Sequence, residues 1–165
     1  LDGGYHIPIL HPTLDSQLDM ASYRTDLYDT FNVQTSPASD APQGGRIGPG
    51  AVYAWMHPNF MLNRYGTCLD TNWVIPLGPD RCRVQYDFFF EETESSEAKA
   101  LIAQSIEQSA VTQREDIYIS ECVQNGLASG RYTPGRYAPR QEMGEYQFHR
   151  LLAAALRDAI PAQRL

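Results

Sequence analysis

The sequence lacks the features that mark several large classes of protein. No run approaches the roughly 18 consecutive apolar residues of a membrane span, so we expect no membrane segment. The net charge is −7 and the basic residues are scattered, so binding to nucleic acid or to a lipid surface is not expected. The three cysteines, Cys68, Cys82 and Cys122, form no CxxC spacing. We therefore expect reduced thiols and a cytoplasmic protein.

What is present fits one globular domain that begins with antiparallel strands. Apolar residues make up 42% of the chain, which argues against disorder. After a loop over 36–50, rich in Pro, Gly and Ser, four aromatic and β-branched runs are separated by the turn sequences HPN, GT and GPD. These runs, together with a weaker one earlier in the chain, predict strands over 23–34, 51–57, 59–66, 68–78 and 81–90. An antiparallel meander is the expected arrangement.

Helical patterns follow the strands. From Glu94 a long run of helix formers begins, with Ser95 or Ser96 as a cap, and the stop signals are Gly126 and Gly130. A final helix is predicted over 145–160, where Pro161 ends it. This order of elements indicates an α+β domain in which a curved sheet wraps around helices.

Two of the four histidines, His6 and His11, lie five positions apart in "YHIPILHP". On a continuous helix this spacing turns the two rings about 140° apart, so an ordinary helical metal pair is not indicated. Pro8 disfavours helical geometry at Ile7, and a helix that ends near His6 would allow both imidazoles to face one point. Two unrelated histidines at a helix end are the alternative.

A third ligand is expected from the long helix. With about 100° per residue, Asp116 falls on the predicted apolar stripe of that helix, whereas Glu115 falls toward its edge. A carboxylate on a buried face is costly unless it is paired or bound to a metal. Two imidazoles and one carboxylate form the facial triad of non-haem Fe(II) oxygenases, although a zinc site has the same ligand types. Alternatively, the helix breaks near Arg114 and Asp116 caps a second segment.

Four segments in order now carry a resemblance to a known family. These are "LDGGYHIPILH", "NRYGTCLDTNWVIPLGPDRCRVQYDFFF", "QREDIYISECVQNGL" and "GRYAPRQEMGEYQFHRLL". Together they resemble the catalytic domain of Rieske non-haem iron oxygenase α subunits, choline monooxygenase-like branch. The resemblance implies a helix-grip (START/Bet v 1-like) fold, an antiparallel sheet wrapped around a long helix with a C-terminal helix. It also implies a mononuclear Fe(II) held by His6, His11 and Asp116.

Two departures from the family pattern matter. The Cys-x-His and Cys-x-x-His pairs of a Rieske [2Fe-2S] cluster are not in this chain. We therefore expect residues 1–165 to be the mononuclear iron catalytic domain, cut near its start, with the cluster in a missing domain or a partner. Ring-dihydroxylating members of the family usually also have an acidic residue three positions before the first histidine, which forms the bridge to the Rieske centre of the neighbouring subunit. Gly3 stands there, and Asp2 is the nearest candidate for the bridge.

The expected reaction uses Fe(II) and O₂ to hydroxylate a C–H bond next to a quaternary ammonium nitrogen in a choline- or betaine-like substrate. The partners implied by the resemblance are a small-molecule substrate, a reductase and a Rieske electron donor, without which the isolated chain should be inactive. The intact protein is expected to be a homotrimer. An aromatic ring-hydroxylating dioxygenase domain and a non-catalytic helix-grip ligand binder are the alternatives. Aromatic residues on the predicted strands could hold an ammonium group: Tyr53, Trp55, Phe60, Trp73, Tyr86 and Phe88.

Overall fold

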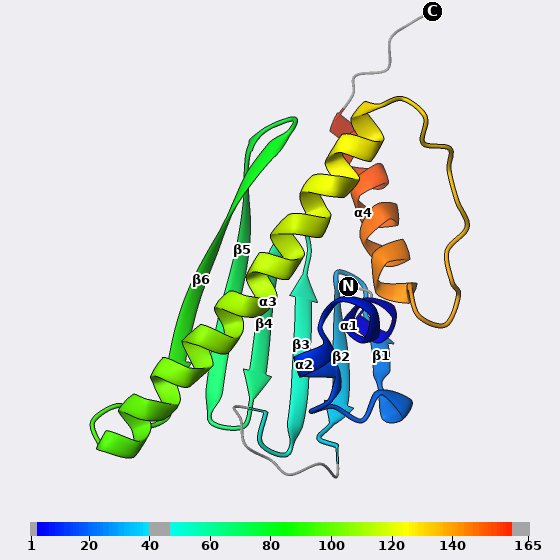
Figure 1. The fold of residues 1–165 in the computed structure, drawn as a ribbon. Coiled ribbons are helices and arrows are strands. Elements are labelled where there is room, and N and C mark those ends of the chain that lie inside the picture. Colours follow the sequence, from blue (N-terminus) through cyan, green and yellow to red (C-terminus); the bar gives the residue numbers. More distant parts are fainter. Residues whose placement is uncertain (1–2, 40–46, 160–165) are drawn as a thin grey trace, which may run out of the picture.

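The computed structural model describes residues 3–39 and 47–159, and its main feature is one six-stranded sheet (Figure 1). The strands run in the order β1-β2-β3-β4-β5-β6, and each neighbouring pair is antiparallel. Their bounds are β1 Arg24–Leu27, β2 Phe31–Pro37, β3 Gly50–Met56, β4 Phe60–Tyr65, β5 Cys68–Gly78 and β6 Arg81–Phe90. The predicted meander is confirmed.

The helices lie on one face of this sheet. They are α1 Gly3–Leu10, α2 Pro12–Asp15, the 3₁₀ helix η1 Met20–Ser22, α3 Ser96–Ala128 and α4 Met143–Ala159. The long helix α3 crosses the sheet diagonally, and α1 and α2 lie in front of the same face (Figure 1). This arrangement confirms the predicted α+β class with a sheet that grips a long helix. Within the described residues, no helix combines the length and the apolar character needed to cross a membrane.

Two boundaries among the strands differ from the prediction. The segment 23–34 is not one strand, because residues 28–30 turn and β1 pairs back onto β2. The amide of Tyr28 donates to the carbonyl of Phe31 at 2.9 Å, which closes this turn. The predicted loop over 36–50 is shorter than expected, since β2 continues to Pro37; residues 40–46 of it lie outside the described residues.

The helix boundaries also show where single-residue signals were right or wrong. Ser95 caps α3 as predicted, because its hydroxyl accepts from the amide of Ala98 at 3.1 Å. The helix does not break near Arg114. It passes through Gly126 as well, and it ends before Gly130, whose positive φ of 68° suits the end of a helix. The last helix begins at Met143, and the predicted stop at Pro161 lies outside the described residues.

A small apolar cluster fastens the N-terminal helices to the sheet. Ile7 of α1, Leu18 and Ile47 pack against Ala51 of β3 and Tyr65 of β4, and all five side chains are buried. Full burial of a side chain such as Ile7 contributes about 1.5–3 kcal/mol to folding. The cluster therefore fixes the position of α1, and with it the position of both N-terminal histidines.

The rest of the described interior is unusually polar. As many polar as apolar residues are buried, and the polar ones are His11, Asn32, Gln34, Ser36, Asp70, Asn72, Ser105 and Ser109. Strand register places several of them on the sheet face that α3 covers, since Tyr53 pairs with Asn63 and Asn63 pairs with Asp70. Buried polar groups are costly in a dry core, so this interior is suited to a polar ligand.

Candidate metal centre

His6 and His11 converge although the helix does not end where the sequence predicted. Helix α1 continues through Ile7 and Pro8 to Leu10, so the predicted break near His6 is wrong. The interruption falls at His11, whose φ of −121° and ψ of 68° lie outside the helical region. Because the backbone at His11 is not helical, its ring need not point about 140° away from the ring of His6, as it would on a continuous helix.

Asp116 comes from the middle of α3, as predicted, but the buried face of that helix differs from the predicted apolar stripe. Its buried residues are Ala98, Ser105 and Ser109, whereas Val123 and Leu127 are exposed. The last turns of the helix, from residue 120 onward, are exposed throughout. The angular position of Asp116 was therefore correct, but the buried residues of that face are small ones, and Ser109 among them lines a cavity.

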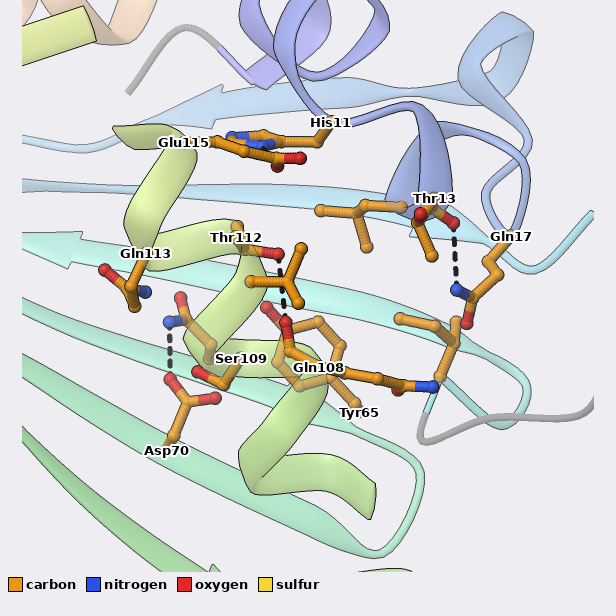
Figure 2. Close-up of a pocket in the computed structure, with 14 residues that line it drawn as sticks. His11, Thr13, Gln17, Tyr65, Asp70, Gln108, Ser109, Thr112, Gln113 and Glu115 are labelled. Atoms are coloured by element: carbon orange, nitrogen blue, oxygen red, sulfur yellow. Dashed lines mark hydrogen bonds and ion pairs between the residues drawn. The ribbon is translucent and has the colours of Figure 1, made fainter. Parts of the chain in front are cut away.

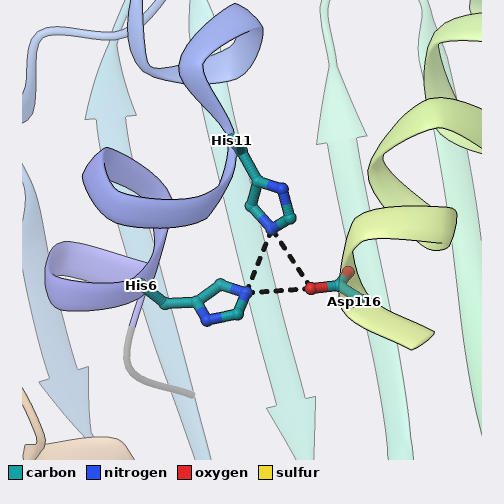
Figure 3. A group of neighbouring side chains, drawn as sticks. All are labelled: His6, His11 and Asp116. Atoms are coloured by element: carbon teal, nitrogen blue, oxygen red, sulfur yellow. Dashed lines mark hydrogen bonds and ion pairs between the residues drawn. The ribbon is translucent and has the colours of Figure 1, made fainter. Parts of the chain in front are cut away.

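The three side chains meet at one point (Figure 3). His6 Nε2 lies 2.9 Å from Asp116 Oδ1, His11 Nε2 lies 3.0 Å from His6 Nε2, and His11 Nε2 lies 3.1 Å from Asp116 Oδ1. The side chain of His11 is only 4% exposed, and those of His6 and Asp116 are 28% and 36% exposed. Three atoms that can donate lone pairs thus form a nearly equilateral triangle, with one ligand buried and two facing more open space.

The size of this triangle allows one metal ion to bind all three side chains. With metal–ligand bonds of about 2.1 Å, donor atoms lie about 3.0 Å apart at octahedral angles and about 3.4 Å apart at tetrahedral angles. The observed separations of 2.9, 3.0 and 3.1 Å match the octahedral value. Two imidazoles and one carboxylate are the ligand types of the facial triad of non-haem iron oxygenases, so the residues present fit an iron ion.

Glu115 orients His11 from the side away from the triangle. Its Oε2 atom lies 2.7 Å from His11 Nδ1. An ionised carboxylate can only accept, so His11 Nδ1 carries the hydrogen and donates it. In the neutral imidazole this leaves the lone pair of Nε2 pointing at His6 and Asp116, as a metal ligand requires. The sequence analysis placed Glu115 toward the edge of the helix and missed this contact. The available signal was a second acidic residue directly before the expected ligand Asp116.

The same contacts shift the pKa values of the site. Burial would lower the pKa of His11, but hydrogen bonds and negative charge from Asp116 and Glu115 outweigh it and raise the pKa above the ordinary 6.5. Burial would raise the pKa of Asp116, but hydrogen bonds and charge from His11 and His6 hold it at about 2, below the ordinary 3.8. Without metal, the site therefore favours an ion pair between His11 and Asp116.

This ion pair predicts a pH window for the stability of the metal-free protein. The lowered pKa of Asp116 adds stability that is fully present above about pH 3.8 and is lost as pH falls toward about 2. The raised pKa of His11 adds stability that is fully present below about pH 6.5 and is lost as pH rises through its folded value. Urea unfolding from pH 2 to 9 should show the wild type exceeding Asp116→Asn most between these limits. A pH-independent difference between the two proteins would contradict this prediction.

Other predicted site residues are not part of the centre. Asp2 lies outside the described residues, and at Gly3 the backbone amide donates to Gln34 Oε1 at 3.2 Å. Of the six aromatic candidates, Phe60 and Trp73 pair with each other across β4 and β5 on the outer face, away from α3. The other four are on the helix-facing side, but among the described residues none of the six lines the cavity beside His11. The sequence also gave no sign that Asn63 and Asp70 line that cavity.

The fold and the site together agree with one family. Residues 1–158 match the family described as "Ring hydroxylating alpha subunit (catalytic domain)", and the chain belongs to this family. Members of this Rieske non-haem iron family use iron, and the candidate centre supplies ligands of the right types.

Two relatives of the chain are enzymes named choline monooxygenase. The chain is 43% identical to "Choline monooxygenase, chloroplastic" of Arabidopsis thaliana over 92% of its own length, and 36% identical to the enzyme of that name from Amaranthus tricolor over 90%. It spans 36% and 34% of those relatives, about a third of their length.

Solved structures of one enzyme share the fold. The chain resembles the quaternary ammonium Rieske monooxygenase CntA with an inhibitor at a TM-score of 0.76 and 22% identity, over 93% of this chain and 45% of that one. It resembles CntA in complex with its substrate L-carnitine at a TM-score of 0.68 and 25% identity, over 91% of this chain and 42% of the other. These likenesses support the helix-grip arrangement of the sheet and α3.

Proposed function

We propose that this chain is the catalytic domain of a Rieske-type monooxygenase that acts on a quaternary ammonium compound. The observation that carries the proposal is the triangle of His6, His11 and Asp116, with sides of 2.9 to 3.1 Å, in a chain of this family. These three residues would hold Fe(II), which supplies the activation of O₂ when it is bound. Glu115 would hold the buried His11 ring in the orientation that a metal ligand needs, since its carboxylate lies 2.7 Å from His11 Nδ1.

The substrate class follows from the relatives. Two relatives are named choline monooxygenase, and CntA is described as a quaternary ammonium monooxygenase with L-carnitine as a substrate. Choline and carnitine both carry a trimethylammonium group. Hydroxylation inserts one oxygen atom of O₂ into a C–H bond and reduces the other to water, with two electrons and two protons supplied from outside the substrate. For choline the reacting C–H bond would be on the carbinol carbon, one carbon removed from the nitrogen, and the product would be an aldehyde hydrate.

The source of these electrons lies outside the described residues. We propose that a Rieske [2Fe-2S] cluster, in a further domain or in a partner, receives electrons from a reductase and passes them to the iron, with Asp2 as the candidate bridge. The proposal includes residues 1–165 as the mononuclear iron domain, a homotrimeric intact protein and a cytoplasmic location.

Reconstitution tests the proposal. The chain loaded with Fe(II) without oxygen is combined with a Rieske-type electron donor, its reductase, choline and O₂, and the aldehyde is measured by mass spectrometry. We expect aldehyde from the wild type only when choline, O₂ and the electron donor are all present, and none from His6→Ala. Binding of choline without any product in the presence of an active donor would instead indicate a ligand-binding protein.

A further inference from the structure

The two histidines of the candidate metal centre are supported in different ways. Glu115 lies beside the ring of His11 at the edge of a cavity (Figure 2), and its carboxylate accepts from His11 Nδ1 at 2.7 Å. Within the described part of the chain, no hydrogen-bond partner holds Nδ1 of His6 in the same way, and its Nε2 atom faces His11 and Asp116. The direction of the His6 ring therefore depends on how the backbone of α1 is placed.

The first turn of α1 is held at two places, one on each side of His6 in the sequence. Ile7, the next residue, is buried in the apolar cluster that fastens α1 to the sheet. Gly3, three residues before His6, donates its backbone amide to Gln34 Oε1 at 3.2 Å. The first amides of a helix have no acceptor within the helix, so the Gln34 side chain on β2 serves as the acceptor for this end of α1. Two anchors fix both the position and the tilt of the turn that carries His6.

The start of α1 lies very close to the sheet at Gln34. Tyr23 donates its hydroxyl to the same Oε1 atom at 2.7 Å, so this oxygen accepts from two donors. A Cβ atom at Gly3 would lie 2.0 Å from the hydroxyl oxygen of Tyr23 and 3.0 Å from Oε1 of Gln34. A side chain at position 3 would therefore push Tyr23 away from Gln34. Glycine at this position allows the helix end, the phenol and the amide to meet in one place.

The side chain of Gln34 is the first member of a chain of amides that reaches α4. Its Nε2 atom donates to Asn32 Oδ1 at 3.3 Å, and Asn32 Nδ2 donates to Gln147 Oε1 at 3.1 Å. Gln147, on α4, donates in turn to the backbone carbonyls of Tyr28 and Phe31, the latter at 3.2 Å. Gln34 and Asn32 are 3% and 0% exposed, so water does not compete for these bonds. The chain thus links the start of α1 to α4 through buried side chains.

This chain of amides can run in one direction only. A backbone amide can only donate, so the atom of Gln34 that faces Gly3 is the oxygen, and the nitrogen faces Asn32. The two carbonyls at the far end can only accept, so the atom of Gln147 that faces them is the nitrogen. Both ends therefore require the same order of donors and acceptors. The loss of any member is costly, because its neighbour is left with an unpaired buried group.

We propose that Gln34, Asn32 and Gln147 position His6 for metal binding, because they hold the first turn of α1 from the side of α4. This inference rests on the metal centre of the proposed function and goes beyond it, since none of the three residues belongs to that centre. Gln34 contacts α1 directly, whereas Asn32 and Gln147 act through Gln34. Without Gln147 the buried amide of Asn32 loses its acceptor, so Asn32 and Gln34 rearrange and release Gly3.

Methionine variants test this role, because methionine is similar in size to glutamine but forms only weak hydrogen bonds. The variants are Gln34→Met, Gln147→Met and the double variant. The matched control is Gln85→Met, which removes an exposed amide from β6 of the same sheet. Co(II) affinity and the visible cobalt spectrum are measured by titration without oxygen. Hydrogen exchange of the α1 amides is measured by NMR on the metal-free chain.

We expect Gln34→Met to weaken Co(II) binding about 10-fold and to shift the cobalt spectrum, because the His6 ring loses its fixed direction. Gln147→Met should weaken binding by about 3-fold, since it acts through two intervening side chains. The double variant should match Gln34→Met, because both substitutions act through one contact with α1. Exchange of the α1 amides should rise in the same order, and Gln85→Met should equal the wild type in every measurement.

A wild-type affinity and spectrum in Gln34→Met would overturn the inference, even if the α1 amides exchanged faster, since His6 would then be placed without this contact. Additive effects of the two substitutions would also overturn it, because Gln147 would then act independently of Gln34. If Gln34→Met does not fold, the half-buried Gln147 decides the test: unchanged affinity and spectrum in Gln147→Met contradict the inference. In all three cases the proposed function stands. If the wild type itself binds no Co(II), the metal centre of the proposed function fails, and the inference fails with it.

Discussion

Asp116→Ala is expected to abolish stoichiometric binding of Fe(II). The wild type should retain about one iron per chain after anaerobic desalting, because two imidazoles and a carboxylate are already positioned with donor atoms 2.9 to 3.1 Å apart. Loss of the carboxylate removes the only negative ligand of the three and the group that draws both imidazoles together. The loss of affinity should exceed the roughly 10–100-fold effect of removing a residue that only supports a ligand. Iron is measured by a ferrous chelator after acid release.

The matched control is Glu121→Ala, which removes an exposed carboxylate from the same helix five residues further on. It should bind iron like the wild type. His6→Ala should also lose iron, since its Nε2 atom supplies one corner of the triangle. Unchanged iron content in both Asp116→Ala and His6→Ala would contradict the proposed centre.

The sequence was sufficient for the parts of this site that depend on helix geometry. The angular position of Asp116 on α3 depends only on the count of residues along a regular helix, and it was correct even though the neighbouring stripe was not apolar. The strands from Gly50 to Phe90 were also predictable, since short turns with Gly and Pro fix where each strand ends.

Features set by tertiary contacts were not predictable in this way. The break at His11, rather than at His6, depends on how α1 packs through Ile7 onto the sheet. Asp70 and Asn72 share one face of β5, opposite Leu69 and Trp73, and the usual rule would turn such a polar face toward solvent. In the structure α3 covers that polar face, and Asp70 lines a cavity between the helix and the sheet. Alternation along a strand defines two faces, but it does not say which face is covered.

The contact between Glu115 and His11 gives a second large and testable effect. Glu115→Ala should weaken metal binding by about 10–100-fold, because His11 would lose the acceptor that fixes its Nδ1–H and aims its Nε2 lone pair. Co(II) is a suitable probe, since its affinity and its visible spectrum can be measured in one titration without oxygen. A change in the cobalt spectrum would show altered ligand geometry, which a general loss of stability would not produce.

The conservative variant separates orientation from charge. In Glu115→Gln the amide oxygen can still accept from His11 Nδ1, so ring orientation should be kept and most of the affinity retained, with a smaller loss because a neutral acceptor makes the imidazole a weaker donor to the metal. The cobalt spectrum of Glu115→Gln should therefore resemble that of the wild type, whereas that of Glu115→Ala should not. Equal affinity and identical spectra in the wild type and Glu115→Ala would show that the packing of α1 alone orients His11. We expect metal affinity to fall from the wild type to Glu115→Gln and then to Glu115→Ala. The reason is that the 2.7 Å contact of Glu115 both orients the His11 ring and places a negative charge beside it.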